Sequence, residues 1–274
     1  MITVQNTEKI VMNSPIIEFY EDEGLINGRT MLVANEERIE IVDLLMKKKI
    51  DTCLFLFVRE DEDSFDFSNL PIIYEFKNAS NKNKIYNYKN KFLIARTPLG
   101  GPAAVGLMED LGFLGIKNFI AFGSAGKIDN NFDSTKFVLV DKAIRDEGTS
   151  YHYQKPSIYS ETDKELTKYI QNYLDKNDLK YEIHTTWTTD AFFRETQKAI
   201  EKRIEQGAVC VEMECASWCA CAKYRNYKFA QVLYFSDTIK QGEHTWHLDR
   251  NEIKARMTKY IVNCVSDYVL DNRG

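Results

Sequence analysis

The sequence predicts an α/β fold in which helices flank a central, twisted, mixed but mostly parallel sheet. Short apolar runs of strand length alternate with amphipathic segments of helix length, and this alternation is typical of parallel α/β sheets. A chain of 274 residues can fill one large core. We find no internal repeat and no linker-like stretch, so we expect one domain over residues 1–274, in which residues 1–29 form an N-terminal extension.

The first half of the chain predicts two β-α-β units. The first helix has an apolar side formed by Ile39, Val42, Leu45 and Met46. The acidic stretch 60–66 and the Asn- and Lys-rich stretch 77–91 are expected to be exposed loops or hairpin edges. In chain order, the predicted elements are strand Thr30–Ala34, helix Glu36–Lys48, strands Thr52–Val58 and Phe92–Arg96, the Pro/Gly turn Thr97–Pro102, helix Ala103–Leu114 and strand Asn118–Phe122.

The second half continues the alternation of strands and helices. We predict strands at Lys136–Val140, Tyr181–Thr185, Ala208–Val211 and Phe229–Phe235, and helices at Thr162–Lys176, Glu195–Gln206, Ala216–Arg225 and Glu252–Leu270.

Composition excludes several classes of protein. With 36 Lys and Arg against 41 Asp and Glu, the net charge is −5, which argues against a dedicated nucleic-acid binder. The N-terminus lacks the basic start and apolar run of a secretory signal, and no stretch approaches 18 apolar residues in length. We therefore expect a cytoplasmic protein with no nucleic-acid or membrane partner.

The cysteines show no spacing typical of a zinc site. We expect them to be reduced and buried in the core, rather than to form a redox pair or bind a metal. They are Cys53, Cys210, Cys215, Cys219, Cys221 and Cys264.

Polar or glycine-rich segments follow several predicted strands, where open α/β sheets bind their ligands. These segments are residues 97–102, 123–126, 188–194, 212–214 and 236–237. The turn at 123–126 can bring backbone N–H groups to an anion, but glycines also simply make turns. The sequence has neither a phosphate-binding loop of the ATPase type nor a G-x-G-x-x-G dinucleotide pattern.

Two of these segments carry acids. Glu212 and Glu214 end an apolar strand, where they can answer the dipole of the next helix or accept the vicinal hydroxyls of a sugar. Asp237 follows another apolar strand, as the cap of a turn or as a general acid. His244 and His247 lie three residues apart without an evident third ligand, so a loop or lid is favoured over a zinc site.

These pieces, in this order, resemble the nucleoside phosphorylase-I superfamily. Residues 211–216 (Val-Glu-Met-Glu-Cys-Ala) are similar to its V-E-M-E-x-A signature, and residues 236–237 to the Ser-Asp of its purine branch. Residues 123–126 resemble its G-[ST]-x-G turn, and residues 190–193 its D-x-F-[YF] base loop. Residues 145–153, which begin Arg-Asp-Glu-Gly-Thr-Ser, are similar to a segment of uridine phosphorylase-like members. The resemblance covers the chain from about Thr30 and implies the phosphorylase/hydrolase-like fold.

The resemblance also implies roles for individual residues. Asp237 would be the catalytic acid that protonates purine N7. The other roles are a ribose site at Met213, Glu214 and Glu212, a base site at Phe192 and Arg194, and a phosphate or water site at Ser124, Arg38 and Thr97.

Some positions depart from the family pattern. Ala121 stands where family phosphorylases have an arginine that contacts phosphate, and only Arg38 remains of the N-terminal G-D-P-x-R loop. Thr196 and Lys198 stand where uridine phosphorylases read uracil, which favours a purine. We therefore expect phosphorolysis of a nucleoside, with hydrolysis by water and non-catalytic nucleoside binding as alternatives. The resemblance implies inorganic phosphate as co-substrate, no metal or organic cofactor, and a homo-oligomer (a dimer, trimer or hexamer).

Overall fold

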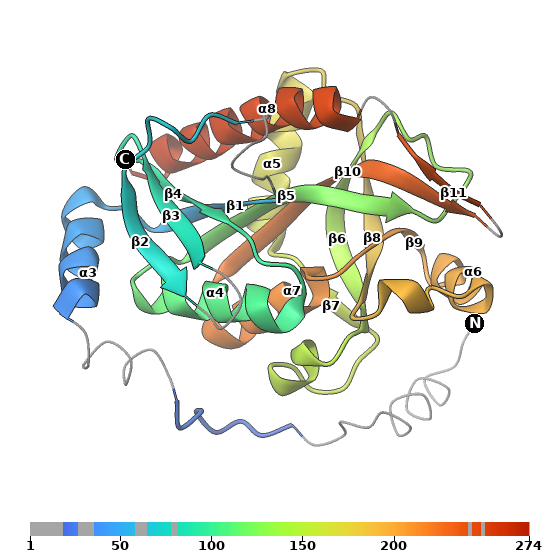
Figure 1. The fold of residues 1–274 in the computed structure, drawn as a ribbon, viewed down its shortest axis with the longest axis horizontal. Coiled ribbons are helices and arrows are strands. Elements are labelled where there is room, and N and C mark those ends of the chain that lie inside the picture. The colour runs from blue at the N-terminus through green and yellow to red at the C-terminus, as the bar shows by residue number, and fades with distance from the viewer. Residues whose placement is uncertain are drawn as a thin grey trace.

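A computed structural model gives the fold of residues 19–26, 36–57, 65–77, 82–240, 243–247 and 250–273. In these residues eleven strands form one mixed sheet, with helices on both of its faces (Figure 1). The order of ten strands is β11-β10-β6-β8-β9-β5-β1-β4-β3-β2, and β7 pairs with β6. The predicted α/β class and mixed sheet are therefore confirmed.

The strands differ in how they pair. Parallel pairings join β1 with β4 and β5, β10 with β5, β6 with β8, and β8 with β9. Antiparallel pairings occur in the edge hairpins and where β9 and β6 close the sheet around β5 and β10. The strands are β1 (Thr52–Leu56), β2 (Ile72–Lys77), β3 (Lys82–Tyr88), β4 (Phe92–Arg96), β5 (Asn118–Lys127), β6 (Phe137–Asp146), β7 (Tyr159–Glu161), β8 (Tyr181–Thr189), β9 (Ala208–Glu212), β10 (Lys228–Lys240) and β11 (Glu243–Trp246).

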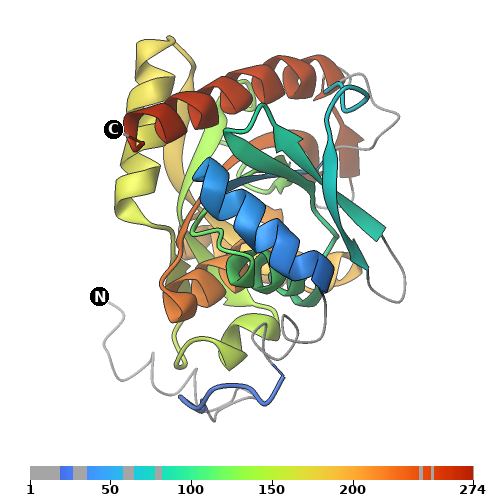
Figure 2. The same ribbon diagram turned by 90° about the vertical axis from the view of Figure 1, so that its left-hand side faces the viewer.

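Two helical layers cover the sheet. Figure 2 shows α5 and α8 on one face and α4 and α7 on the other, with α3 beside the edge strands. The helices are α3 (Glu36–Lys48), α4 (Gly101–Phe113), α5 (Lys164–Lys176), α6 (Gln197–Glu205), α7 (Cys215–Arg225) and α8 (Arg250–Asp271), with short 3-10 turns η1 (Thr149–His152) and η2 (Phe192–Arg194).

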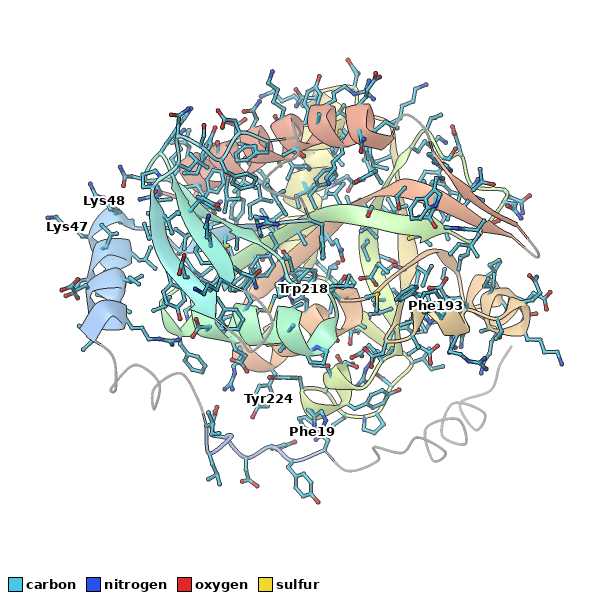
Figure 3. The ribbon with its side chains drawn as sticks, viewed as in Figure 1. Phe19, Lys47, Lys48, Phe193, Trp218 and Tyr224 are labelled. Carbon is cyan, nitrogen blue, oxygen red and sulfur yellow. The ribbon has the colours of Figure 1, made fainter. Side chains whose placement is uncertain are left out.

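Alternation along the central strands divides the core between the two layers. Cys53 and Phe55 of β1 pack on the side of α4 and α7, whereas Leu54 and Leu56 pack on the side of α5 and α8. Trp218 of α7, labelled in Figure 3, is fully buried and stacks on Phe55 at 5.3 Å between ring centroids. A strand that is buried on both faces reads as a continuous apolar run, which explains why β1 was predictable.

Most predicted elements are present, with shifted ends. The strand predicted at Thr30–Ala34 and residues 60–64 of the acidic stretch 60–66 lie outside the described residues. The stretch 77–91 contains β3, which forms an edge hairpin with β2. Of the two predicted alternatives, an exposed loop or a hairpin edge, the hairpin is therefore the one present. All six cysteines are buried and free of disulfides, as predicted.

Two strands run further than predicted, and this changes the expected turn at 123–126. Gly123 to Gly126 continue β5, because β10 extends to Lys240 and pairs with them. Glycine is required for close packing at both ends of this stretch. A Cβ at Gly123 would lie 2.5 Å from the Phe57 ring, and one at Gly126 would lie 2.8 Å from Ile239 Cδ1. The prediction of a turn was therefore wrong.

Candidate functional site

Glu212 fastens the start of α7 to the end of β9. Its Oε2 accepts the backbone N–H groups of Glu214 and Cys215 at 2.8 and 2.7 Å, and its Oε1 accepts the Thr188 hydroxyl at 2.5 Å. Helix N-termini leave such N–H groups without partners inside the helix, and a carboxylate satisfies them and the dipole. The helix-dipole interpretation therefore fits Glu212.

Glu214 is the second buried acid of this pair. Only 3% of the residue is exposed, and Oε1 accepts the backbone N–H of Gly100, just before α4, at 2.6 Å. Burial, and then the charge of Glu212, raise the pKa of Glu214 to about 8. Burial also raises the pKa of Glu212, to about 7, although the three hydrogen-bond donors that it faces lower the pKa. Those donors make Glu212 the first of the two to ionise.

Asp237 lies at a bulge within β10, not at the end of the strand as the sequence predicted. The ladder to β5 shifts register between Phe235 and Asp237, and this turns the Asp237 side chain out of the regular alternation. Oδ1 accepts the Ser236 hydroxyl at 2.6 Å, and Oδ2 lies 2.8 Å from His244 Nε2. The carboxylate is thus held at both oxygens, although the residue is only 8% exposed.

Strand β5 connects the two acidic segments. Gly126 pairs with Val211 of β9 on one side and with Asp237 of β10 on the other. Neighbouring strands lie about 4.8 Å apart, so the backbones at Val211 and Asp237 are roughly 10 Å from each other. Glu214 follows Val211 by three residues. The two acidic segments therefore lie near the same end of β5.

An exposed aromatic segment follows β8. Phe192 is 50% exposed and Phe193 88% exposed, and their rings lie 4.0 Å apart at the centroids (Figure 3). Arg194 completes this turn and is also exposed. Such rings are free to stack on a planar ligand. Met213, between the two glutamates, is half-buried.

Sequence reasoning missed Glu195. It follows the aromatic segment directly, and its pKa is raised to about 7 by burial and by the negative charge of Asp237. The signal was its position beside the predicted base loop, but an acid in a polar loop gives no indication of what it faces. His244 was predicted in a loop or lid, whereas it lies in β11 and contacts Asp237 across the hairpin.

The predicted acceptor residues are only partly brought together. Ser124 lies exposed on β5, opposite Tyr234 of β10, close to the glycines described above. Thr97 follows β4, and its buried hydroxyl has no hydrogen-bond partner among the described residues. Ala121 is fully buried in β5. A buried hydroxyl without a partner costs free energy.

Arg38 lies away from this group. Its Nη1 pairs with Asp110 Oδ1 at 2.6 Å and its Nη2 donates to the Tyr74 hydroxyl at 2.5 Å. Asp110 is nine residues along α4 from Gly101, which at 1.5 Å per residue is roughly 13 Å from the Glu214 contact. The geometry gives no support to the phosphate contact predicted for Arg38.

Arg145, from the segment that resembles uridine phosphorylase-like members, is structural. Only 4% exposed, its guanidinium donates to Ser150 Oγ at 2.8 Å and to the carbonyl groups of Gln154 and Lys155. These bonds hold the loop that carries η1. The same loop contacts the base-loop segment, because Asp190 Oδ2 accepts the backbone N–H of Gly148 at 2.9 Å.

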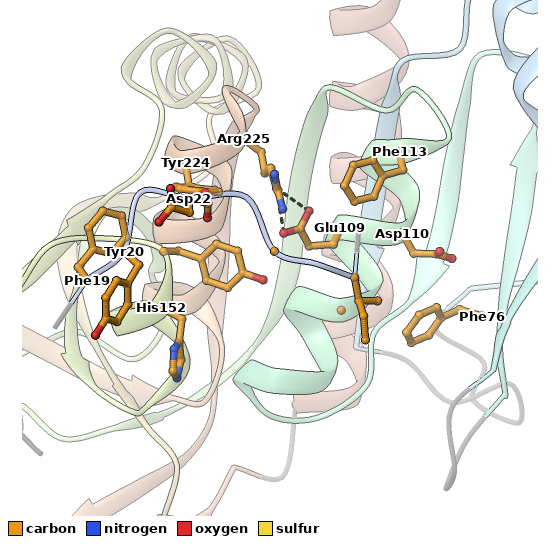
Figure 4. Close-up of a pocket in the computed structure, with 14 residues that line it drawn as sticks. Phe19, Tyr20, Asp22, Phe76, Glu109, Asp110, Phe113, His152, Tyr224 and Arg225 are labelled. Atoms are coloured by element: carbon orange, nitrogen blue, oxygen red, sulfur yellow. Dashed lines mark hydrogen bonds and ion pairs between the residues drawn. The ribbon is translucent and has the colours of Figure 1, made fainter. Parts of the chain in front are cut away.

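A cavity of about 480 Å³ lies elsewhere, between residues 19–26 and helices α4 and α7 (Figure 4). Its acid Glu109 is already paired with Arg225, whose Nε contacts both carboxylate oxygens at 2.8 and 2.9 Å. The cavity contains neither Glu214 nor Asp237 among its lining residues. The volume of this cavity is therefore no evidence that it is the reactive site.

The described part of the chain contains neither a candidate metal-ion cluster nor a helix that could span a membrane. No group of three or more His, Cys, Asp or Glu side chains there is arranged to hold a metal ion. None of the helices described has both the length and the apolar composition that crossing a bilayer requires.

Comparison with known proteins gives one family. The family model of the phosphorylase superfamily matches residues 64–266, a region that runs from before β2 into α8 and includes Glu214 and Asp237. The chain is similar to a guanosine phosphorylase of Halorubrum lacusprofundi, at 23% identity over 149 residues, or 54% of this chain and 62% of the relative. It is also similar to a uridine phosphorylase of Thermococcus kodakarensis, at 29% identity over 100 residues, or 36% of each protein.

A third relative is a DeoD-type purine nucleoside phosphorylase of Shewanella oneidensis. It is 24% identical over 175 residues, which cover 63% of this chain and 74% of the relative. The match spans less than two thirds of the length of the guanosine and uridine phosphorylases. The names of these relatives differ in the base, so they do not agree on a substrate.

Proposed function

Because the chain belongs to the phosphorylase superfamily, we propose that it cleaves the N-glycosidic bond of a nucleoside by phosphorolysis. The products are the free base and ribose 1-phosphate. The observation that carries the proposal is the placement of Asp237 and the Glu214 segment on either side of Gly126. Two acids at that separation suit the two ends of a nucleoside.

The reaction needs both acids for different reasons. As the bond from C1′ to the base breaks, positive charge develops on the ribosyl ring and negative charge on the leaving base. Glu214 accepts the ribose hydroxyls and, when ionised, favours the cationic ring. Asp237 gives a proton to N7 of a purine. Each interaction strengthens towards the transition state, which is the condition for catalysis.

The remaining predicted contacts complete the site in this proposal. Phe192 stacks on the base, Arg194 meets its outer edge, and Met213 lies under the ribose. Ser124 and the unpaired hydroxyl of Thr97 bind the acceptor. Glu212 acts indirectly, since its oxygens hold the start of α7 from which Glu214 projects.

A purine is the proposed base. Asp237 has a chemical task only if the leaving base takes a proton at a position such as N7, and Thr196 and Lys198 are not the residues that read uracil in uridine phosphorylases. Two of the three relatives above carry guanosine or purine in their names. The uridine phosphorylase similarity keeps uridine among the substrates to be tested.

Hydrolysis is the second candidate, because a cationic phosphate ligand is missing from two expected positions. Ala121 replaces an arginine, and Arg38 is paired with Asp110. Charge-assisted hydrogen bonds contribute about 1.5–3 kcal/mol each to the binding of an anion. Water needs no such contact.

One assay separates these activities. The protein is incubated with guanosine, inosine, adenosine, methylthioadenosine and uridine, with and without phosphate, and base release is followed. We expect purine release that requires phosphate and yields ribose 1-phosphate. Release that is unchanged without phosphate establishes the hydrolase instead. No release from any nucleoside, together with measurable binding, establishes a non-catalytic binder.

The same assay tests the other expectations. Activity that survives a chelator agrees with a metal-independent reaction. Sedimentation of the purified protein tests the predicted homo-oligomer.

A further inference from the structure

The carboxylate of Asp237 faces a histidine. His244 Nε2 lies 2.8 Å from Oδ2, while Ser236 holds Oδ1. The two side chains come from opposite strands of the β10–β11 hairpin, in which Ile239 pairs with His244 and Trp246 pairs with Asp237. The imidazole therefore reaches diagonally across the hairpin to the oxygen opposite the one that Ser236 binds.

The two members of this pair differ in their access to solvent. The side chain of His244 is 48% exposed, whereas that of Asp237 is 12% exposed. Water can therefore exchange protons with the imidazole more readily than with the carboxylate. Imidazole is also the side chain that ordinarily changes charge between pH 5 and 8, whereas carboxyl groups in general are ionised there. A carboxyl that must hold a proton once in each turnover needs such a donor.

Resting on the proposed function, we propose that His244 is a proton relay: it passes to Asp237, from Nε2 to Oδ2, the proton that the leaving purine takes at N7. His244 acts through Asp237, so it is a positioning residue and not a catalytic one. No family motif identified in the sequence includes it. The proposal extends the site from Asp237 alone to the pair of Asp237 and His244. His244, the more exposed of the two, takes up a proton again from water.

The proton and electron count of the step balances. The imidazolium gives its Nε2 proton to Asp237, and the resulting carboxylic acid gives a proton to N7. The electron pair of the C1′–N9 bond goes to the purine, which leaves as the neutral base. An oxygen of hydrogen phosphate forms the new bond to C1′. If water takes this place, it releases one of its protons to solvent as the bond forms. Asp237 ends as a carboxylate and His244 as a neutral imidazole, which takes up a proton from solvent before the next turnover.

Glu195, Trp246 and His247 lie near the pair. Glu195 adds a second acid close to Asp237 and His244, and burial together with the charge of Asp237 raises the pKa of Glu195 to about 7. Trp246 packs edge-on against His244 at 4.8 Å between ring centroids and carries no charge. His247 faces Thr238, at 2.8 Å from Nε2 to the hydroxyl, and not Asp237.

A purely structural role for the pair is the competing explanation. In that case the His244–Asp237 contact only pins β11 to β10, and its loss would disturb every substrate equally. A proton relay would affect only substrates whose base must be protonated. Nucleosides methylated at N7 supply the contrast, because 7-methylguanine leaves as a neutral base without a proton at N7.

The test compares His244→Gln with the unchanged protein on guanosine and on 7-methylguanosine, from pH 5.5 to 9. His247→Gln is the matched control, since it alters the other histidine of the hairpin. Glu195→Gln shows whether the pH dependence of cleavage comes from Glu195 instead. We expect His244→Gln to lower kcat/KM for guanosine by about 10- to 100-fold, in the range of general acid catalysis. Its rate on 7-methylguanosine should stay within about twofold.

The pH profile gives a second readout. A relay works only while the imidazole is protonated, so guanosine cleavage by the unchanged protein falls as the pH rises, and this fall is absent in His244→Gln and retained in His247→Gln. Equal losses on both nucleosides, or an unaltered profile in His244→Gln, overturn the relay. A fall that disappears only in Glu195→Gln overturns it as well. If the unchanged protein cleaves neither nucleoside, the proposed function itself fails, and the relay fails with it.

Discussion

Gly126 of β5 pairs with Asp237 of β10, and a Cβ at Gly126 would lie 3.4 Å from Asp237 Oδ2. The same Cβ would lie 2.8 Å from Ile239 Cδ1 and 3.3 Å from Val211 Cγ1. A glycine at this position therefore lets β9, β5 and β10 approach closely while leaving the Asp237 carboxylate in place. The geometry of the site therefore depends on the lack of a side chain at Gly126.

Replacement of Gly126 by alanine should damage activity more than folding. The methyl group has to push Ile239 or Asp237 aside, and a small displacement of a catalytic group can cost about 100-fold in rate. We expect kcat for guanosine to fall at least tenfold while the thermal midpoint changes by a few degrees. Gly106→Ala is the control, because its Cβ meets only Phe76 at 3.6 Å and alanine favours the interior of α4. Full activity in Gly126→Ala would contradict this account of the site.

Asp237→Asn tests the proton donor directly. The amide keeps the size of the side chain and can still bond Ser236, but it cannot deliver a proton to the leaving base. We expect purine release to slow by at least about 100-fold, the usual contribution of a general acid. Base release is measured at saturating nucleoside, with circular dichroism to verify the fold. A rate near that of the unchanged protein would remove Asp237 from the mechanism.

Glu214→Gln should affect ribose recognition. An amide accepts one hydroxyl less well than a carboxylate, and hydrogen bonds to a charged group contribute about 1.5–3 kcal/mol. We therefore expect kcat/KM for a ribonucleoside to fall about 10- to 100-fold. The fall should be smaller for the matching 2′-deoxyribonucleoside, which has one hydroxyl fewer to offer. Equal losses on the two substrates would show that Glu214 does not contact the 2′-hydroxyl.

Burial was easier to predict from the sequence than the contacts of the site. Residues of β1 and β9 are buried throughout because both faces are covered, and all but Thr52 and Glu212 are apolar; that pattern is local. The segment 123–126 shows the limit: two glycines suggest a turn, yet they continue β5 because β10 pairs with them. That pairing partner lies about a hundred residues away, so no local pattern contains it. The same holds for the ion pair of Arg38 with Asp110, which also joins distant parts of the chain. His244 is close to Asp237 in sequence, but their contact depends on the pairing of β10 with β11.

The buried pair of glutamates predicts how stability depends on pH. The pKa of Glu214 is about 8 in the folded protein, against an ordinary value of 4.5, so the folded state binds this proton more tightly than the unfolded state. The contribution of Glu214 to stability is therefore fully present below about pH 4.5 and is lost as the pH rises through about 8. Glu214→Gln cannot ionise. Between pH 5 and 9, the thermal midpoint of Glu214→Gln should therefore rise relative to that of the unchanged protein. The rise should be about 2–4 °C for each kcal/mol of stability that the unchanged protein loses. A constant difference between the two midpoints would show that Glu214 ionises freely.

Arg38 provides a test that separates structure from phosphate binding. Asp110 is 7% exposed, and removal of its partner in Arg38→Met leaves a buried charge unpaired, which destabilises proteins by about 3–5 kcal/mol. The double variant Arg38→Met/Asp110→Leu should recover most of that loss, because an apolar pair can replace a buried ion pair. Denaturant unfolding measures both variants. If Arg38 also contacted phosphate, the KM for phosphate would rise at least about tenfold in the double variant, as expected for the loss of a charge-assisted hydrogen bond. We expect no such rise, since the guanidinium is held by Asp110 and Tyr74.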